Sequence, residues 1–525
     1  MLTYVHNFFK LYYFFYPVKN IMLLLQPPFV KSCEPSAALA QLTAYLRGNG
    51  ERCFPYDLSI ECLHHLLETT PVANDTWSKR AFRNRKENIT LLKSGKGYTN
   101  YSRYERAVSD INRIIEIAGK RHGIQLNLEN YQDSRLSPLK SEDLLYAMEH
   151  YRENIFFPYL GKRIASLIDK HNPTRIGLSL NFLSQALPTF AIIGFLKSSF
   201  PELKIIVGGG LITSWHKSPQ WTNPFKGVVD QFVVGAGEAP LLEIVSGKTD
   251  GEEQTPEHKD LLGNNYLAPG YILPFTASIG CYWRKCSFCP ETSENSPYIC
   301  LSNNQVQRDL GSLIEKTRPR LIHFLDSAIS PRLMTDLIRQ PPGVPWYGFA
   351  RICEQLTDPD FTRALKKSGC AMLKLGLESG SSYVLEQMNK GISLSLASRV
   401  LRSLEQAGIA TYVYLLFGTA SEDIGEARKT LRFASEHASA ITYTNLSIFN
   451  LPICSQETET LETINRHEGD LTLYTDFIHP KGWGRKEIRK FLNNEFKRHP
   501  LIMPILRENP PFFSSNHAPF FHKNS

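Results

Sequence analysis

Short apolar runs alternate with stretches of helical apolar spacing along most of the chain, which predicts parallel strands joined by helices. Residues 21–27 form one apolar run ended by two prolines, as expected for a buried parallel strand. Residues 36–48 carry leucines at helical spacing, and residues 52–58 read as the next strand. Strand, helix and strand in this order predict the start of a doubly wound α/β domain.

This alternation of strands and helices is interrupted and then resumes. Residues 66–170 are polar and show helical spacing without a strand signal, so we interpret them as a helical insertion. Further strands are then predicted at 175–180, 203–210 and 230–238, with helices after Pro188 and from Pro240. Residues 21–250 are therefore predicted to form one Rossmann-like, doubly wound domain that contains the insertion.

A second α/β unit is predicted at 273–470, between a linker at 251–272 and a tail at 471–525. Its six strand-like runs lie at 275–280, 320–326, 346–351, 371–379, 410–418 and 441–450. The helical patterns between them lie at 305–316, 332–339, 358–368, 383–406 (broken at Gly391) and 423–437. Ligands are expected at the carboxyl ends of such strands.

Composition narrows the class of protein. A chain of 525 residues should hold more than one domain, and a net charge of +8 over this length does not argue for nucleic acid. Seven of the ten cysteines are scattered singly, unlike a secreted disulfide framework, so we expect a cytoplasmic protein. No apolar run reaches the ~18–20 residues that span a bilayer. We expect residues 1–20 to be a non-native or disordered extension, with translation starting at Met22.

Three cysteines, Cys281, Cys286 and Cys289, fall within nine residues directly after an apolar run. Three soft thiolates in one loop suit a zinc ion or an iron–sulfur cluster. A closed zinc site needs four ligands, and the nearest further cysteine is Cys300. A cluster held by three cysteines leaves one iron open for another ligand. Inert core cysteines and a zinc knuckle are the alternatives.

The segment from Ala277 to Pro290 resembles the cluster loop of radical SAM enzymes, including the aromatic Phe288 before the last cysteine. The spacing here is CxxxxCxxC, whereas CxxxCxxC is usual in that family. The resemblance implies a 4Fe-4S cluster on the three cysteines, S-adenosylmethionine as cofactor, and a partial (β/α)6 barrel for the second unit.

The glycine-rich strand ends before this loop resemble the cobalamin-binding domain fused to many radical SAM enzymes. The residues that carry this resemblance, and that it implies bind cobalamin, are Gly208, Gly209, Gly210, Gly235 and Glu238. The Asp-x-His-x-x-Gly signature of cobalamin-ligating mutases is absent, so we expect no histidine on the lower cobalt face. His216 is the local histidine that could contradict this expectation.

Polar residues at the predicted strand ends complete the candidate site. The stretch from Leu377 to Ser382 resembles one found across cobalamin-type radical SAM enzymes, which implies that Glu378 contacts the ribose of S-adenosylmethionine, with Ser379 beside it. A carboxylate accepts hydrogen bonds from a diol well. Arg351 could pair with the methionine carboxylate, and Asp326 could receive the ammonium group.

The resemblance implies an enzyme that reductively cleaves S-adenosylmethionine to a 5′-deoxyadenosyl radical. The first hypothesis is that the enzyme uses cobalamin to methylate an unactivated carbon. Rearrangement, cyclisation or tRNA methylthiolation, or a non-enzymatic zinc protein, are the alternatives. The implied partners are a small-molecule or peptide substrate and an electron donor such as flavodoxin or ferredoxin.

Overall fold

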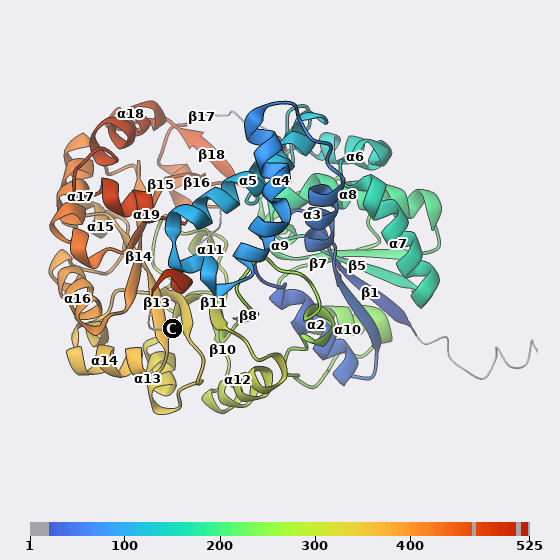
Figure 1. Cartoon of the computed structure of the whole chain (residues 1–525), viewed down its shortest axis with the longest axis horizontal. Helices are drawn as coiled ribbons and strands as arrows, with labels where there is room; N and C mark the ends of the chain where they lie inside the picture. The colour runs from blue at the N-terminus through green and yellow to red at the C-terminus, as the bar shows by residue number, and fades with distance from the viewer. Residues whose placement is uncertain (1–19, 465–468, 511–515, 523–525) are drawn as a thin grey trace, which may run out of the picture.

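The computed structural model describes residues 20–464, 469–510 and 516–522. The extension expected over residues 1–20 lies outside these ranges except for Asn20. The chain forms two α/β halves side by side, and helices α4 and α5 cross in front between them (Figure 1). None of the helices in the described ranges is both long and apolar enough to span a lipid bilayer.

The N-terminal half is built on a five-stranded parallel sheet of order β2-β1-β5-β6-β7. Counted along this sheet's own strands the order is 2-1-3-4-5, so connections leave β1 and β5 towards opposite faces and open a crevice at their carboxyl ends. The strands are β1 (Ile21–Gln26), β2 (Arg52–Asp57), β5 (Arg175–Ser179), β6 (Lys204–Gly208) and β7 (Gln231–Val233).

Helices cover both faces of this sheet, as the doubly wound prediction requires. Because successive side chains of a strand point to opposite faces, Met22 and Leu24 pack with α2 and α10, whereas Leu23 and Leu25 pack with α3 and α8. The helices are α2 (Ala37–Gly48), α3 (Leu58–Thr69), α8 (Leu183–Ser199), α9 (Gly210–Lys217) and α10 (Glu238–Ser246).

The C-terminal half contains a six-stranded parallel sheet of order β15-β14-β13-β12-β11-β8, which confirms the predicted alternation of strands and helices. The strands are β8 (Ile272–Phe275), β11 (Leu321–Ile329), β12 (Trp346–Ala350), β13 (Cys370–Glu378), β14 (Ala410–Phe417) and β15 (Tyr443–Ile448). The helices are α12 (Asn303–Thr317), α13 (Pro331–Arg339), α14 (Pro359–Lys367), α15 (Ser382–Gln387), α16 (Leu394–Ala407) and α17 (Ile424–Glu436).

Three predicted elements differ from the structure. The strand expected at 230–238 forms only over β7, and Glu238 already begins α10. The first strand of the second sheet was expected at 275–280, but β8 ends at Phe275 because Asp326 takes the Ala277 N–H and the Ser278 hydroxyl and turns the chain away. The helix expected after Pro188 begins at Leu183 and contains this proline. Its start is fixed by the Gln185 side chain, which accepts hydrogen bonds from the N–H groups of Asn181 and Phe182.

The insertion joins the two halves. Its helices are α4 (Thr76–Leu92), α5 (Tyr101–Lys120), α6 (Ser141–Glu149) and α7 (Phe157–His171). A hairpin that the sequence did not predict, β3 (Ile124–Leu126) and β4 (Tyr131–Asp133), lies between α5 and α6. Residues of α5 share one hydrophobic core with inward-facing side chains of the second sheet, among them Tyr347, Met372 and Tyr412.

A buried carboxylate also links the halves. Glu34, in the loop after β1, lies next to Nδ1 of His323 on β11 at 2.9 Å and forms an ion pair with Lys31. Burial alone would raise the pKa of Glu34, but His323 and Lys31 hold it well below its usual range. Burial lowers the pKa of His323 to about 4, so at neutral pH the positive charge beside Glu34 comes from Lys31.

The segment predicted as a tail, residues 471–525, contains regular structure. Its strand β18 (Tyr474–Phe477) pairs with β16 (Leu451–Pro452) and β17 (Thr463–Ile464), which precede the segment, and it carries the helices α18 (Arg485–Phe491) and α19 (Met503–Glu508). After α19, the Asn509 side chain accepts a hydrogen bond from the N–H of Thr444 and donates one to its carbonyl, along the outer edge of β15. His517 is buried, with Nε2 2.7 Å from the Leu267 carbonyl oxygen and Nδ1 2.9 Å from the Tyr104 hydroxyl.

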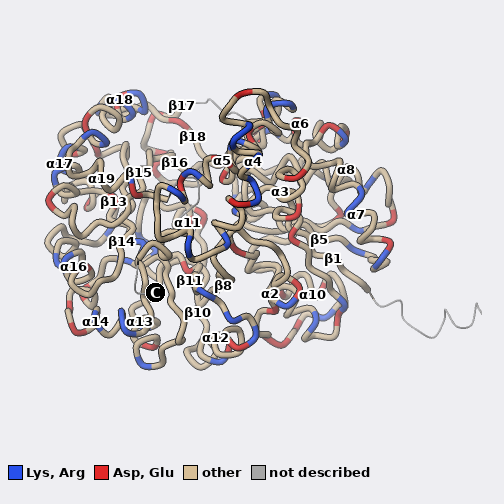
Figure 2. The backbone as a smooth tube through the Cα atoms, in the orientation of Figure 1, with Lys and Arg blue, Asp and Glu red and all other residues tan. Residues whose placement is uncertain are grey.

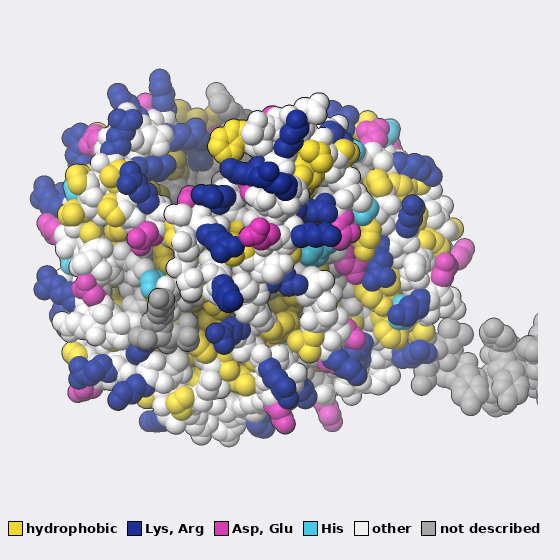
Figure 3. All heavy atoms as spheres, viewed as in Figure 1, with side chains coloured by type: hydrophobic (Ala, Val, Ile, Leu, Met, Phe, Trp, Pro, Cys, Tyr) yellow, Lys and Arg dark blue, Asp and Glu magenta, His cyan; other side chains and the backbone are white. Residues whose placement is uncertain are grey.

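Charged residues are distributed over both halves. In the described part of the chain, Lys and Arg are scattered among Asp and Glu over both halves (Figure 2). On the face shown in Figure 3, basic side chains are likewise spread among acidic and uncharged ones. This agrees with the mild net charge of the sequence.

Glu422 provides a pH test of the fold. This fully buried carboxylate accepts hydrogen bonds from the Gly418 N–H and the Trp483 indole N–H, and burial raises its pKa to about 7. The folded state therefore holds the proton more tightly than the unfolded state, so stability should fall as pH rises from about 4.5 to about 7. We expect Glu422→Gln to remove this slope and to stabilise the protein at pH 8 by about 2 kcal/mol. Urea unfolding of both proteins across this range measures the difference, and parallel curves would contradict it.

Candidate functional site

A buried carboxylate, that of Asp326, holds the start of the cysteine loop in place. Asp326, on β11 and 1% exposed, accepts hydrogen bonds from the Ala277 N–H at 3.0 Å and the Ser278 hydroxyl at 2.5 Å. Burial raises the pKa of Asp326. In this structure Asp326 therefore fixes the start of the loop, and its predicted contact with an ammonium group stays a prediction.

The three predicted cysteines lie on this loop, with Cys286 buried and Cys281 and Cys289 half-buried. Burial raises the pKa of Cys286, while Lys390 and Arg351 act in the opposite direction. Within the described ranges, no three Cys, His, Asp or Glu side chains are arranged to bind a metal ion. The donor set nevertheless fits an iron–sulfur cluster, because thiolates are its usual ligands and neighbouring cations favour the thiolate form.

Arg351 follows the end of β12 and touches the loop directly. Its Nη1 lies 3.7 Å from Sγ of Cys286, its Nη2 donates to the Lys390 carbonyl, and its guanidinium stacks 4.3 Å from the Trp283 ring centre. The Trp283 indole N–H in turn donates to the Asn389 carbonyl at 3.1 Å. The loop is thereby fastened to the segment after α15, with a cation against its middle cysteine.

Glu378, at the end of β13, forms an ion pair with Lys390, for which no role was predicted. Nζ of Lys390 lies 2.7 Å from Oε1 of Glu378, and their side chains are 8% and 12% exposed. Glu378 has φ +65°, an uncommon conformation for a residue other than glycine and one that concentrates at functional sites. A side chain at Gly376 would collide with both partners, since its Cβ would lie 2.4 Å from Glu378 Oε1 and 2.8 Å from Lys390 Nζ.

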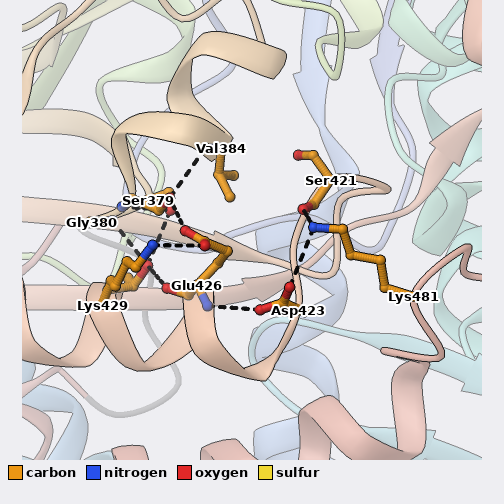
Figure 4. Close-up of polar contacts among 10 residues, drawn as sticks. Ser379, Gly380, Val384, Ser421, Asp423, Glu426, Lys429 and Lys481 are labelled. Atoms are coloured by element: carbon orange, nitrogen blue, oxygen red, sulfur yellow. Dashed lines mark hydrogen bonds and ion pairs between the residues drawn. The ribbon is translucent and has the colours of Figure 1, made fainter.

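The turn after Glu378 is supported from behind by α17. Ser379 is fully buried and its hydroxyl lies 3.1 Å from Oγ1 of Thr430, which also accepts a hydrogen bond from the Gly380 N–H. In Figure 4 Ser379 and Gly380 lie beside Glu426 of α17, and Lys481 lies beside Asp423, the residue that caps α17. The Ser379 side chain is thus engaged within the protein.

One pocket lies between this loop and the N-terminal sheet. It has a volume of about 490 Å³ and is lined by the carboxyl ends of β1, β5, β6 and β7 together with Ile279 and Ile299 from the segments flanking the cysteine loop. All five residues predicted to bind cobalamin line this one pocket: Gly208, Gly209, Gly210, Gly235 and Glu238. The structure therefore brings together residues that the sequence grouped only by resemblance.

The shape of the pocket depends on its glycines. Gly209 has φ +115°, and a Cβ there would lie 2.5 Å from the Leu180 carbonyl oxygen. A Cβ at Gly210 would meet nothing closer than 3.8 Å, and one at Gly235 nothing within 4 Å, so the backbone presents an open surface to the pocket. The floor is apolar and includes Leu24, Leu39, Leu42, Ile206 and Leu241. Such a surface fits a large, flat, largely apolar ligand such as a corrin ring.

His216 does not contribute to this lining. Its Nδ1 lies 2.9 Å from the Ile212 carbonyl oxygen, and its ring packs against Trp221 and Phe232. It behaves as a partly buried packing histidine.

The buried pair of Glu378 and Lys390 gives a stability test. Lys390→Met should lower the free energy of unfolding by about 3 kcal/mol, because Glu378 would remain buried without its partner. The double variant Glu378→Gln/Lys390→Met should lose less free energy of unfolding than Lys390→Met alone, because no unpaired charge remains buried. The exposed pair of Arg399 and Glu354 is the control, and Arg399→Met should cost under about 1 kcal/mol. Equal losses in urea unfolding of the two single variants would contradict the assignment.

Comparisons with known proteins identify the fold. No family model matches the chain. An uncharacterized methyltransferase of Pyrococcus horikoshii is 22% identical over 315 residues, which cover 52% of this chain and 66% of the relative. The chain thus spans just under two thirds of the length of this curated relative.

Two solved structures align with most of the chain. OxsB, a cobalamin-dependent S-adenosylmethionine radical enzyme with aqua-cobalamin bound, aligns with TM-score 0.51 and 16% identity over 81% of this chain and 53% of its own. TsrM from Kitasatospora setae, a radical S-adenosylmethionine methyltransferase with tryptophan substrate and aza-SAM bound, aligns with TM-score 0.50 and 13% identity over 82% of this chain and 74% of its own. The chain therefore shares the mixed α/β fold, with parallel sheets, of OxsB and TsrM.

Proposed function

We propose that the chain is a radical SAM enzyme that uses cobalamin, and that it acts as a methyltransferase. The observation that carries the proposal is the position of the glycine-lined pocket, which lies directly against the segments that flank the three-cysteine loop. One ligand in the pocket and one on the loop would be neighbours, as a reaction that uses both requires.

The six-stranded sheet is interpreted as the partial barrel of this family, with its site at the carboxyl ends of the strands. Cys281, Cys286 and Cys289 would hold a 4Fe-4S cluster, which with S-adenosylmethionine supplies a 5′-deoxyadenosyl radical when reduced by one electron. Arg351 provides positive charge beside Cys286, and the Trp283 ring stacks against its guanidinium group. Glu378 presents its carboxylate at the end of β13 for a ribose diol, with Lys390 holding its orientation.

Cobalamin would occupy the pocket of the N-terminal half, over its glycines and apolar floor, and would supply the methyl group. OxsB and TsrM, which share the fold, are described as cobalamin-dependent and as a methyltransferase, respectively. The curated relative is also named a methyltransferase. We therefore favour methyl transfer to an unactivated carbon of a small molecule or peptide, with an acidic electron carrier such as flavodoxin or ferredoxin as reductant.

The cluster assignment is tested by iron content. After anaerobic reconstitution, Cys281→Ala, Cys286→Ala and Cys289→Ala should each lose most of the bound iron, because a cluster held by three thiolates loses a corner in each. Cys300→Ala, an exposed cysteine outside the loop motif, is the matched control and should keep its iron. Full iron in the loop variants, or one tightly bound zinc per wild-type chain, would refute the assignment.

The cobalamin assignment is tested by filling the pocket. Gly210→Phe should raise the Kd for hydroxocobalamin more than about tenfold, a loss of about 1.4 kcal/mol, because the ring enters open space above the glycine turn. Gly311→Phe is the matched control, since Gly311 also lies in a helix with nothing within 4 Å of its Cβ position. Wild-type affinity in the Gly210 variant, measured by absorbance titration, would exclude this pocket.

A further inference from the structure

Glu291 lies where the pocket meets the strand ends of the second sheet. It is the second residue of α11 (Pro290–Ser293), directly after Cys289, and it lines the pocket. Its Oε1 accepts a hydrogen bond from the hydroxyl of Ser327, an exposed residue on β11. Glu291 therefore connects the lining of the pocket to a strand of the second sheet.

The second oxygen of this carboxylate is not satisfied. Oε2 of Glu291 is buried and has no hydrogen-bond partner among the residues that the structure describes. A buried acceptor left without a donor costs about 1–3 kcal/mol, more when it is charged. The terminal torsion of a glutamate is soft, so this oxygen can turn towards the pocket when a donor arrives there. The missing donor is therefore expected from a ligand.

The charge of the pocket lining indicates which kind of hydrogen-bond donor the ligand would carry. The lining contains three acidic side chains, Glu238, Glu291 and Glu294, and one basic side chain, Lys217, so its formal net charge is −2. Lys217 is already engaged, with its Nζ 3.9 Å from Glu294 Oε2 and 3.2 Å from Ser296 Oγ. A pocket with surplus negative charge attracts cations.

We propose that Glu291 binds a protonated amine of the substrate, and that the enzyme therefore acts on amine-bearing compounds. This inference rests on the proposed function, because it puts the substrate between cobalamin and S-adenosylmethionine. An ammonium group would supply the donor that Oε2 lacks through a charge-assisted hydrogen bond, and it would offset the charge of the lining. The bond would orient the rest of the substrate towards both cofactors.

Two other roles for Glu291 make different predictions. A peripheral amide of cobalamin could supply the donor, in which case Glu291 would contribute to cobalamin affinity. The contact with Ser327 could instead serve only to fasten the cysteine loop, in which case removing the Ser327 hydroxyl would have the same effect as changing Glu291.

The experiment uses anaerobic protein loaded with iron–sulfur cluster and hydroxocobalamin, and three probes with one apolar body: phenethylamine, 2-phenylethanol and 3-phenylpropionate. Equilibrium dialysis measures the Kd of each. Wild-type protein should bind phenethylamine at least about tenfold more tightly than 2-phenylethanol, the ratio that one charge-assisted hydrogen bond supplies, and should bind the anion most weakly.

Glu291→Gln should remove the preference for the amine while leaving iron content and hydroxocobalamin affinity unchanged. Glu294→Gln, three residues along the chain, and Ser327→Ala are the controls and should keep the preference. The proposal is overturned if wild-type protein shows no amine preference, if Glu291→Gln retains it, if Glu291→Gln weakens hydroxocobalamin binding, or if Ser327→Ala abolishes the preference equally. Failure of wild-type protein to take up iron and cobalamin would instead refute the proposed function.

Discussion

The buried contact between Glu34, paired with Lys31, and His323 links the two halves of the molecule within their shared core. The candidate site lies between the two sheets, so its geometry depends on how the halves are joined. A carboxylate that is 4% exposed is stable there only while it remains paired. Asn516 donates a further hydrogen bond to the same carboxylate, so the last described segment of the chain is part of this junction.

Rigid support is the common property of the residues around the cysteine loop. Asp326 fixes the start of the loop, and Trp283 and Arg351 fasten its middle to the backbone of residues 389 and 390. The uncommon backbone conformation of Glu378 is sustained by Lys390 in front and by the hydroxyls of Ser379 and Thr430 behind. A site supported in this way keeps its charged groups in position without help from water.

The sequence predicted the elements whose signal is local. The alternation of apolar runs with helical spacing located both sheets, the spacing of the cysteines located the loop, and the resemblance grouped the glycines that line the pocket. Contacts across the fold carried no such signal. Lys390 reaches Glu378 only because the chain reverses through α15, and the contact of Glu291 with Ser327 joins residues 36 positions apart in sequence. The early end of β8 likewise depends on a side chain from another strand, Asp326.

The amide of Asn509 has a consequence for the solubility of this architecture. The outermost strand of an open parallel sheet exposes peptide groups that can recruit a strand from another molecule. On β15, Asn509 bonds to both the N–H and the carbonyl of Thr444, as a seventh strand would. One side chain thereby occupies the peptide groups through which a further strand would pair at this residue.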